Sequence, residues 1–122
     1  MILADTNIWL VHFRQPDAKL TELVSNRQLH VHPMVLGEIA VGPIIGRDDV
    51  LTMLDELPRC ETASHEEVMQ FIESVPLHSR KLSYIDVHLL AATMLTAGCR
   101  LWTRDRRLLA AAGLLKLGAD LP

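Results

Sequence analysis

Residues Met1–Asn7 have the sequence MILADTN, in which a short apolar run ends at an acidic residue and a helical stretch follows. The apolar run predicts a buried strand over Met1–Ala4, and the residues after it predict a helix over Asn7–Phe13. Asp5 therefore stands where a strand ends and a helix begins. This succession is the first unit of an alternation of strands and helices that continues along the chain.

The rest of the sequence repeats this alternation. Short apolar or alternating segments predict further strands at Leu29–His32, Arg59–Thr62, Arg100–Thr103 and Leu115–Leu117. Apolar spacing, caps and breakers predict helices at Asp17–Asn26, Met34–Val41, Asp48–Leu57, Ser64–Val75, Tyr84–Ala97 and Asp105–Ala112. Such alternation favours an α/β fold with a central parallel sheet and helices on both faces. A chain of 122 residues without repeats or linkers predicts a single domain over residues 1–122.

The composition excludes several classes of protein. Apolar residues make up 49% of the chain, enough for a real core, but no apolar run approaches the roughly 20 residues of a membrane helix. The first residues lack the basic stretch and long apolar region of a signal peptide, so a cytoplasmic protein is expected. Cys60 and Cys99 are the only cysteines and have no Cys-x-x-Cys spacing, which favours two half-buried thiols over a zinc site.

The net charge of −3 is unevenly distributed. Residues 1–79 hold five basic and twelve acidic residues, a net charge of −7, whereas residues 80–122 hold seven basic and three acidic residues, a net charge of +4. This asymmetry indicates either a face that tolerates phosphates or a solvated helix surface. Arg104, Arg106 and Arg107 are the densest part of the basic region and the candidates for contact with nucleic-acid phosphates.

Two acidic residues directly follow predicted strands, where open α/β sheets collect their functional side chains. Asp5 follows the first strand and can act as a helix N-cap, a metal ligand, or both, because a carboxylate has several lone pairs. Asp105 follows the Arg100–Thr103 strand. Its arginine neighbours allow an ion pair as the alternative to a metal-binding role.

Two further acidic residues lie in apolar surroundings. Glu38 is inside the segment Val35–Ala40, where a buried carboxylate needs either a basic partner or a metal ion. Asp86 is the fourth residue of the cap sequence SYID, and the helix dipole would favour its charge there by about 0.3–1 kcal/mol. Helical spacing places Asp86 at the end of an apolar stripe, so its carboxylate is expected to be partly desolvated. A cap and a metal ligand both remain open for this residue.

Other catalytic motifs are missing from the sequence. It contains no Gly-x-Ser-x-Gly, no Gly-x-x-x-x-Gly-Lys and no Gly-x-Gly-x-x-Gly. His30 and His32 alternate on one side of a predicted strand, but without a third nearby ligand they are interpreted as ordinary histidines. The acidic residues are therefore the best candidates for chemistry.

Four segments of the chain together resemble PIN-domain proteins, and most closely the VapC toxins of VapBC toxin–antitoxin pairs. They are, in order, DTN at 5–7, GE at 37–38, SYIDVHLLAA at 83–92 and LWTRD at 101–105. The resemblance spans the whole chain. It implies a three-layer α/β/α fold, Mg²⁺-dependent endoribonuclease activity, inhibition by a cognate VapB-type antitoxin, and frequent homodimerisation.

The resemblance also implies roles for individual residues. Asp5 and Asp86 match the principal metal ligands of the family, and Glu38 and Asp105 match its other two acidic positions. Thr6 and Thr103 lie where hydroxyl groups often support the site.

Hard carboxylate ligands suit Mg²⁺ or Mn²⁺ rather than zinc. Such an ion lowers the pKa of a water that attacks the phosphorus and neutralises charge on the phosphate oxygens, and whether one or two ions act stays open. The alternatives are a PIN-like or receiver-like module that binds Mg²⁺ without cutting RNA, and a nuclease that cuts DNA. A receiver is disfavoured because no acidic residue ends the Leu29–His32 strand.

Overall fold

Three short parallel strands form the centre of the computed structural model, which describes residues 1–122. β1 (Ile2–Ala4) lies between β2 (Leu29–His30) and β3 (Arg100–Trp102), and Ile2 is in register with Leu29 on one side and Arg100 on the other. Because both pairings are parallel, the carboxyl ends of all three strands meet at one edge of the sheet.

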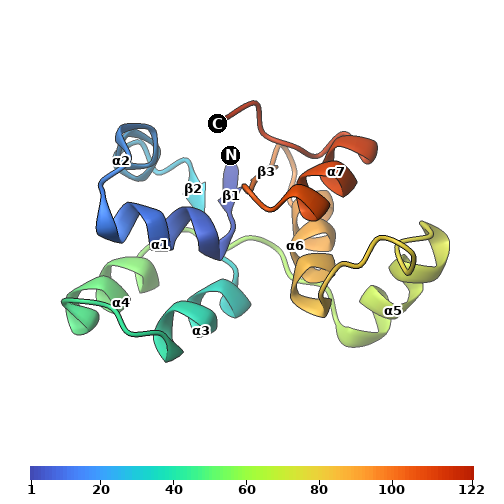
Figure 1. Ribbon diagram of the computed structural model, residues 1–122, viewed down its shortest axis with the longest axis horizontal. Coiled ribbons are helices and arrows are strands. Elements are labelled where there is room, and N and C mark those ends of the chain that lie inside the picture. Colours follow the sequence, from blue (N-terminus) through green and yellow to red (C-terminus); the bar gives the residue numbers. More distant parts are fainter.

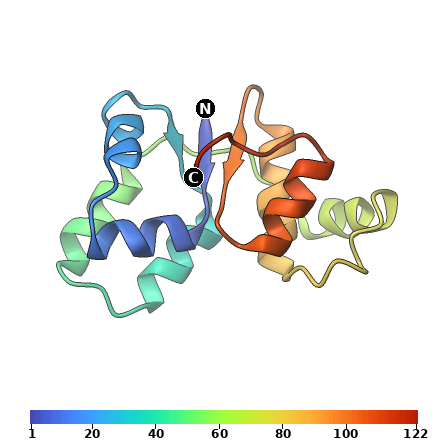
Figure 2. The same ribbon diagram turned by 45° about the horizontal axis from the view of Figure 1, so that its top comes forward.

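Seven helices surround this sheet. They are α1 (Thr6–Arg14), α2 (Ala18–Ser25), α3 (Pro33–Val41), α4 (Arg47–Asp55), α5 (His65–Ser74), α6 (Tyr84–Leu95) and α7 (Arg106–Leu114). Figures 1 and 2 show α1–α4 on one side of the strands and α5–α7 on the other. The predicted α/β fold with a parallel central sheet is thus confirmed. None of the helices is long and apolar enough to cross a lipid bilayer.

The predicted helices agree with the structure to within two residues at each end, and local capping explains this for several of them. The Asp17 side chain accepts a hydrogen bond from the Leu20 amide at the start of α2. Ser64 and Ser83 each form a complete capping box, at the starts of α5 and α6. These signals lie within a few residues of one another, so sequence alone reveals them.

The predicted strands at Arg59–Thr62 and Leu115–Leu117 are wrong. Arg59 forms only an isolated bridge with Val31, because the chain then turns away and the Glu61 amide donates to the Thr96 hydroxyl instead (2.9 Å). Near the end of the chain, the Leu115 amide still donates to a helical carbonyl of α7. Only an isolated bridge to β3 follows at Gly118, in which the Leu117 carbonyl accepts from the Leu101 amide and the Ala119 amide donates to the Leu101 carbonyl.

Helix α6 fixes the geometry of the carboxyl edge of the sheet. Seven consecutive residues, Val87–Thr93, are buried, so the middle of α6 is enclosed on all sides. Trp102 of β3 and Trp9 of α1 are fully buried large side chains of the same core. Side chains just before α6 and just after β3 therefore project from rigid elements.

Candidate active site

Asp5 is a buried carboxylate at the carboxyl end of β1, with only 7% of its surface exposed. Its Oδ1 accepts a hydrogen bond from the Thr6 amide (2.7 Å), which caps α1. Its Oδ2 accepts from the Thr103 hydroxyl (2.8 Å) and the Asn7 amide group (3.3 Å). Asp5 thus acts as a helix cap and is also held by side chains that come from two different elements.

The protonation of Asp5 responds to the other acidic residues at this edge. Burial raises the pKa of Asp5, the hydrogen bonds from Thr103 and Thr6 lower it, and the charges of Asp86 and Glu38 raise it. The pKa of Asp5 lies above its ordinary value because the effect of burial outweighs that of the hydrogen bonds. The structure therefore brings Glu38 and Asp86 within electrostatic reach of Asp5. None of the three forms an ion pair with a basic residue.

Glu38 projects from α3 toward Thr6, whose hydroxyl donates to Glu38 Oε1 (2.7 Å). The expectation that Glu38 is buried among its apolar neighbours is wrong, since its side chain is exposed. The buried side of α3 is formed by Val35 and Ile39 instead. The second carboxylate oxygen of Glu38, Oε2, accepts no hydrogen bond from the protein.

Asp86 is half-buried in the first turn of α6. Its Oδ2 accepts from the Ser83 amide, and the Ser83 hydroxyl accepts from the Asp86 amide, both at 3.1 Å. The cap interpretation of Asp86 is therefore right as far as one oxygen is concerned. Oδ1 has no donor in the protein and is available to a ligand, so capping does not exclude metal binding.

Asp105 is exposed and caps α7, because its Oδ1 accepts from the amides of Arg107 (2.9 Å) and Leu108 (3.1 Å). The alternative for Asp105, an ion pair with the adjacent arginines, is absent. Asp105 is linked to Asp5 through Thr103, whose hydroxyl oxygen accepts from the Asp105 amide (3.1 Å). The structure thus places Asp105 beside the site without directing its carboxylate to Asp5.

Asn7 belongs to the site although the sequence did not single it out. Its side-chain amide reaches both Asp5 and Thr103, at 3.3 and 3.4 Å, and its oxygen accepts from the Arg104 amide at 3.4 Å. Its position two residues after a helix cap was the available signal, because a side chain there can turn back toward the cap. The contact with Thr103 joins positions 96 residues apart and has no local signal.

The donor set fits a hard divalent cation. No group of three Asp, Glu, His or Cys side chains lies at metal-binding spacing. Mg²⁺ does not require one, because it usually binds one or two carboxylates and keeps several waters. Oxygens without a protein donor are present on Asp86 and Glu38, next to the buried Asp5.

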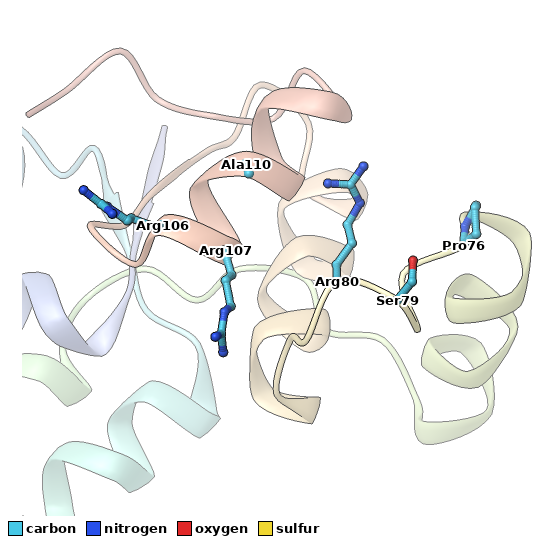
Figure 3. Close-up of a pocket in the computed structure, with 6 residues that line it drawn as sticks. All are labelled: Pro76, Ser79, Arg80, Arg106, Arg107 and Ala110. Carbon is cyan, nitrogen blue, oxygen red and sulfur yellow. The ribbon is translucent and has the colours of Figure 1, made fainter.

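The three candidate phosphate-binding arginines differ in their surroundings. Arg104 forms an ion pair with Asp17 (3.3 Å), donates to the Pro122 carbonyl (3.3 Å) and lies 5.8 Å from the centre of the Trp102 ring. Arg106 and Arg107 are exposed and form no ion pair. They line a hollow of about 550 Å³ together with Arg80 (Figure 3).

Known proteins resemble this chain in sequence and in fold. Residues 2–114 match the model of the PIN domain family. Ribonuclease VapC32, from two strains of Mycobacterium tuberculosis, is 42% identical over 111 residues, which cover 91% of this chain and 90% of that protein. The crystal structure of PAE2754 from Pyrobaculum aerophilum aligns with a TM-score of 0.56 over 95% of this chain and 88% of that one, at 18% identity. This last likeness concerns the fold alone.

Proposed function

This chain belongs to the PIN-domain family and, within it, to the VapC ribonucleases, and we propose that its carboxylate cluster hydrolyses RNA with a divalent cation. It is the toxin endoribonuclease of a VapBC pair, with RNA as its substrate and a VapB antitoxin as its partner. The proposal adds the residues and the ion, Mg²⁺ with Mn²⁺ as a substitute.

One observation supports a cation site above all others. Asp5, Glu38 and Asp86 are close enough for the latter two to raise the pKa of Asp5, yet none of them is paired with a basic side chain. Gathered carboxylates repel one another, and burial adds a further cost to the charge of Asp5. A bound cation removes both penalties, so the cluster has the electrostatics of an ion site.

In this proposal Asp5 and Asp86 are the ligands, and Glu38 and Asp105 assist them. When bound, Mg²⁺ lowers the pKa of an attacking water and neutralises charge on the phosphate. The hydroxyls of Thr103 and Thr6 orient Asp5 and Glu38 through the two short hydrogen bonds described above. Asn7 stabilises the ionised form of Asp5, because its side-chain amide donates to Oδ2.

The test is incubation of pure protein with RNA or with DNA, in Mg²⁺ and in EDTA, followed by analysis of the product ends. We expect RNA cleavage only with the ion, with 5′-phosphate and 3′-hydroxyl ends, because water is the nucleophile. Asp5→Asn, which retains the helix cap, should abolish cleavage while the protein stays folded by circular dichroism. Cyclic phosphate ends would contradict the mechanism, cleavage of DNA alone would make it a DNA nuclease, and no cleavage would favour a regulatory module.

The toxin role has its own test in a bacterial host. Expression of the parent should slow growth and Asp5→Asn should not, and co-expression of the antitoxin should restore growth. Homodimerisation, which the family resemblance implies, and a cytoplasmic location, which we expect from the sequence, belong to this proposal too. Light scattering of the purified toxin measures the first, and fractionation of the host measures the second.

A further inference from the structure

The hollow next to α7 is lined by three arginines that have no acidic partner. Arg80 comes from the turn before α6, whereas Arg106 and Arg107 come from the first turn of α7 (Figure 3). The ion pairs of the protein involve other basic residues, and the three side chains donate no hydrogen bond within the protein. Their side chains point in different directions (Figure 3), and as cations without an acidic partner they make this surface attractive to an anion.

The turn that carries Arg80 on one side of the hollow is anchored to the core on both sides of Arg80. Leu77 is buried in the core, and the Arg80 amide donates to the Leu77 carbonyl (3.0 Å), which closes a turn. Lys81 then adopts a left-handed backbone with φ of 57°, and the chain returns to the core at Leu82. This anchored turn presents Ser79 and Arg80 to the hollow, so the backbone of the turn needs little ordering when a ligand binds.

The opposite wall is one face of α7. Ala110 lies four residues after Arg106 and three after Arg107, so it neighbours both on the helix surface, while the two arginine side chains point apart (Figure 3). The small Ala110 side chain leaves space between the arginines and the turn. The hollow therefore combines a serine, three arginines on its walls and room for a ligand.

We propose that this hollow is a phosphate subsite that binds a backbone phosphate of the RNA strand beside the carboxylate cluster. The inference rests on the proposed function and extends it, because it assigns Arg80 and Ser79 to substrate binding. Arg106 directly follows Asp105, and Arg80 comes three residues before the Ser83 cap that holds Asp86. A strand whose scissile phosphate lies at the carboxylates thus has a cationic surface for a neighbouring phosphate. A guanidinium group can donate two parallel hydrogen bonds to one phosphate, and contacts with the phosphate backbone do not depend on the base sequence.

The first experiment measures binding of a fluorescent single-stranded RNA in EDTA, where cleavage is blocked, over a range of salt concentrations. Arg80→Ala should weaken binding about tenfold. It should also flatten the slope of log K against log salt by about 0.7, the value for one phosphate contact on a single strand. Arg59→Ala is the matched control. This exposed arginine forms an ion pair with Asp55, and its backbone forms a bridge with Val31 at the edge of the sheet opposite β3. The control substitution changes the net charge equally and should leave the slope unchanged.

The second experiment uses Ala110, whose exposed position on α7 tolerates substitution. Ala110→Glu introduces a carboxylate between the arginines, whereas Ala110→Gln introduces a side chain of nearly the same size without charge. We expect Ala110→Glu to weaken RNA binding at least as much as Arg80→Ala, and Ala110→Gln to weaken it much less. Equal effects of the two would mean that the hollow contributes by shape alone, and would overturn the proposal.

Two further outcomes would overturn it. If Arg80→Ala and Ala110→Glu leave the salt slope of RNA binding unchanged, the arginines form a solvated surface. If they leave RNA binding intact but weaken binding of polyglutamate, the hollow serves an acidic protein segment. Cleavage is measured separately with Mg²⁺, and a parent that binds RNA with the predicted slopes but cuts none contradicts the proposed function while supporting the subsite.

Discussion

His32 should make the stability of the protein depend on pH between about 6.5 and 4. Its imidazole is the N-cap of α3, because Nδ1 accepts from the Met34 amide (3.0 Å), and only 2% of the residue is exposed. Burial, with a smaller effect of the nearby His88, lowers the pKa of His32 to about 4. Protonation would also place a proton on Nδ1, which then faces the Met34 amide as a second donor.

The direction and the size of this change in stability with pH follow from the pKa of His32 in the unfolded and in the folded protein. The unfolded chain binds a proton near the ordinary pKa of 6.5, whereas the folded protein does so near about 4. The unfolded state therefore holds more protons in this window, and folding stability falls as the pH is lowered through it. Between pH 7 and about pH 4.5, a depression of this size removes about 2.5 kcal/mol of unfolding free energy.

Urea unfolding at both pH values, for the parent and for His32→Asn, measures this contribution. Asparagine is a good N-cap and does not titrate, so the variant should lose about 2.5 kcal/mol less than the parent between the two pH values. Loss of the imidazole lowers the stability of the variant at both pH values and cancels in this comparison. His30 and His88, whose pKa values burial also lowers, titrate in both proteins. An equal pH effect in parent and variant would refute the reasoning.

Three other perturbations test the site. Thr103→Val removes the hydroxyl that donates to Asp5, and thermal melts should show a loss of about 1.5–3 kcal/mol that Thr103→Ser avoids; equal stability of the two variants would contradict this role. Saturating Mg²⁺ should stabilise the parent, by about 2.7 kcal/mol at 100 times its dissociation constant, and Asp86→Asn should lose most of that gain; equal metal-induced shifts would remove Asp86 from the ion site. Arg104→Ala should cost under about 1 kcal/mol in urea unfolding and flatten the salt slope of RNA binding less than Arg106→Ala, because Arg104 already has an acidic partner; a larger change in slope would reverse this order.

The helices and the positions of Asp5 and Asp105 could be predicted because their signals are local. A cap such as Ser83 and the helix it starts lie within a few residues, and the parallel sheet follows from the order of the elements. The two wrong strands show the limit of local pattern. Whether Arg59–Thr62 forms a strand depends on the hydrogen-bond partner of the Glu61 amide. That partner is the hydroxyl of Thr96, 35 residues away, and not a neighbouring strand.

The surroundings of the acidic side chains depended on equally distant contacts. Helix α3 is apolar on most sides, so its sequence does not show which side faces the core, and Glu38 proved to be exposed. The acidic partner of Arg104 is Asp17, 87 residues away, rather than its neighbour Asp105. The hollow containing Arg80 forms only when two distant segments come together. The uneven charge of the sequence therefore indicated that a positively charged surface exists, but not where it lies in the fold.

The central position of β1 has a consequence for the order in which the toxin matures during synthesis. The first strand of the chain is also the middle strand of the sheet, and its partner β3 begins only at Arg100. The Thr103 hydroxyl that holds Asp5 is 98 residues further along a chain of 122. A nascent chain that ends before β3 lacks one edge of the sheet, the Thr103 clamp and the whole of α7. The proposed nuclease site can therefore assemble only after nearly all of the toxin has been made, and prematurely terminated products should be harmless to the host.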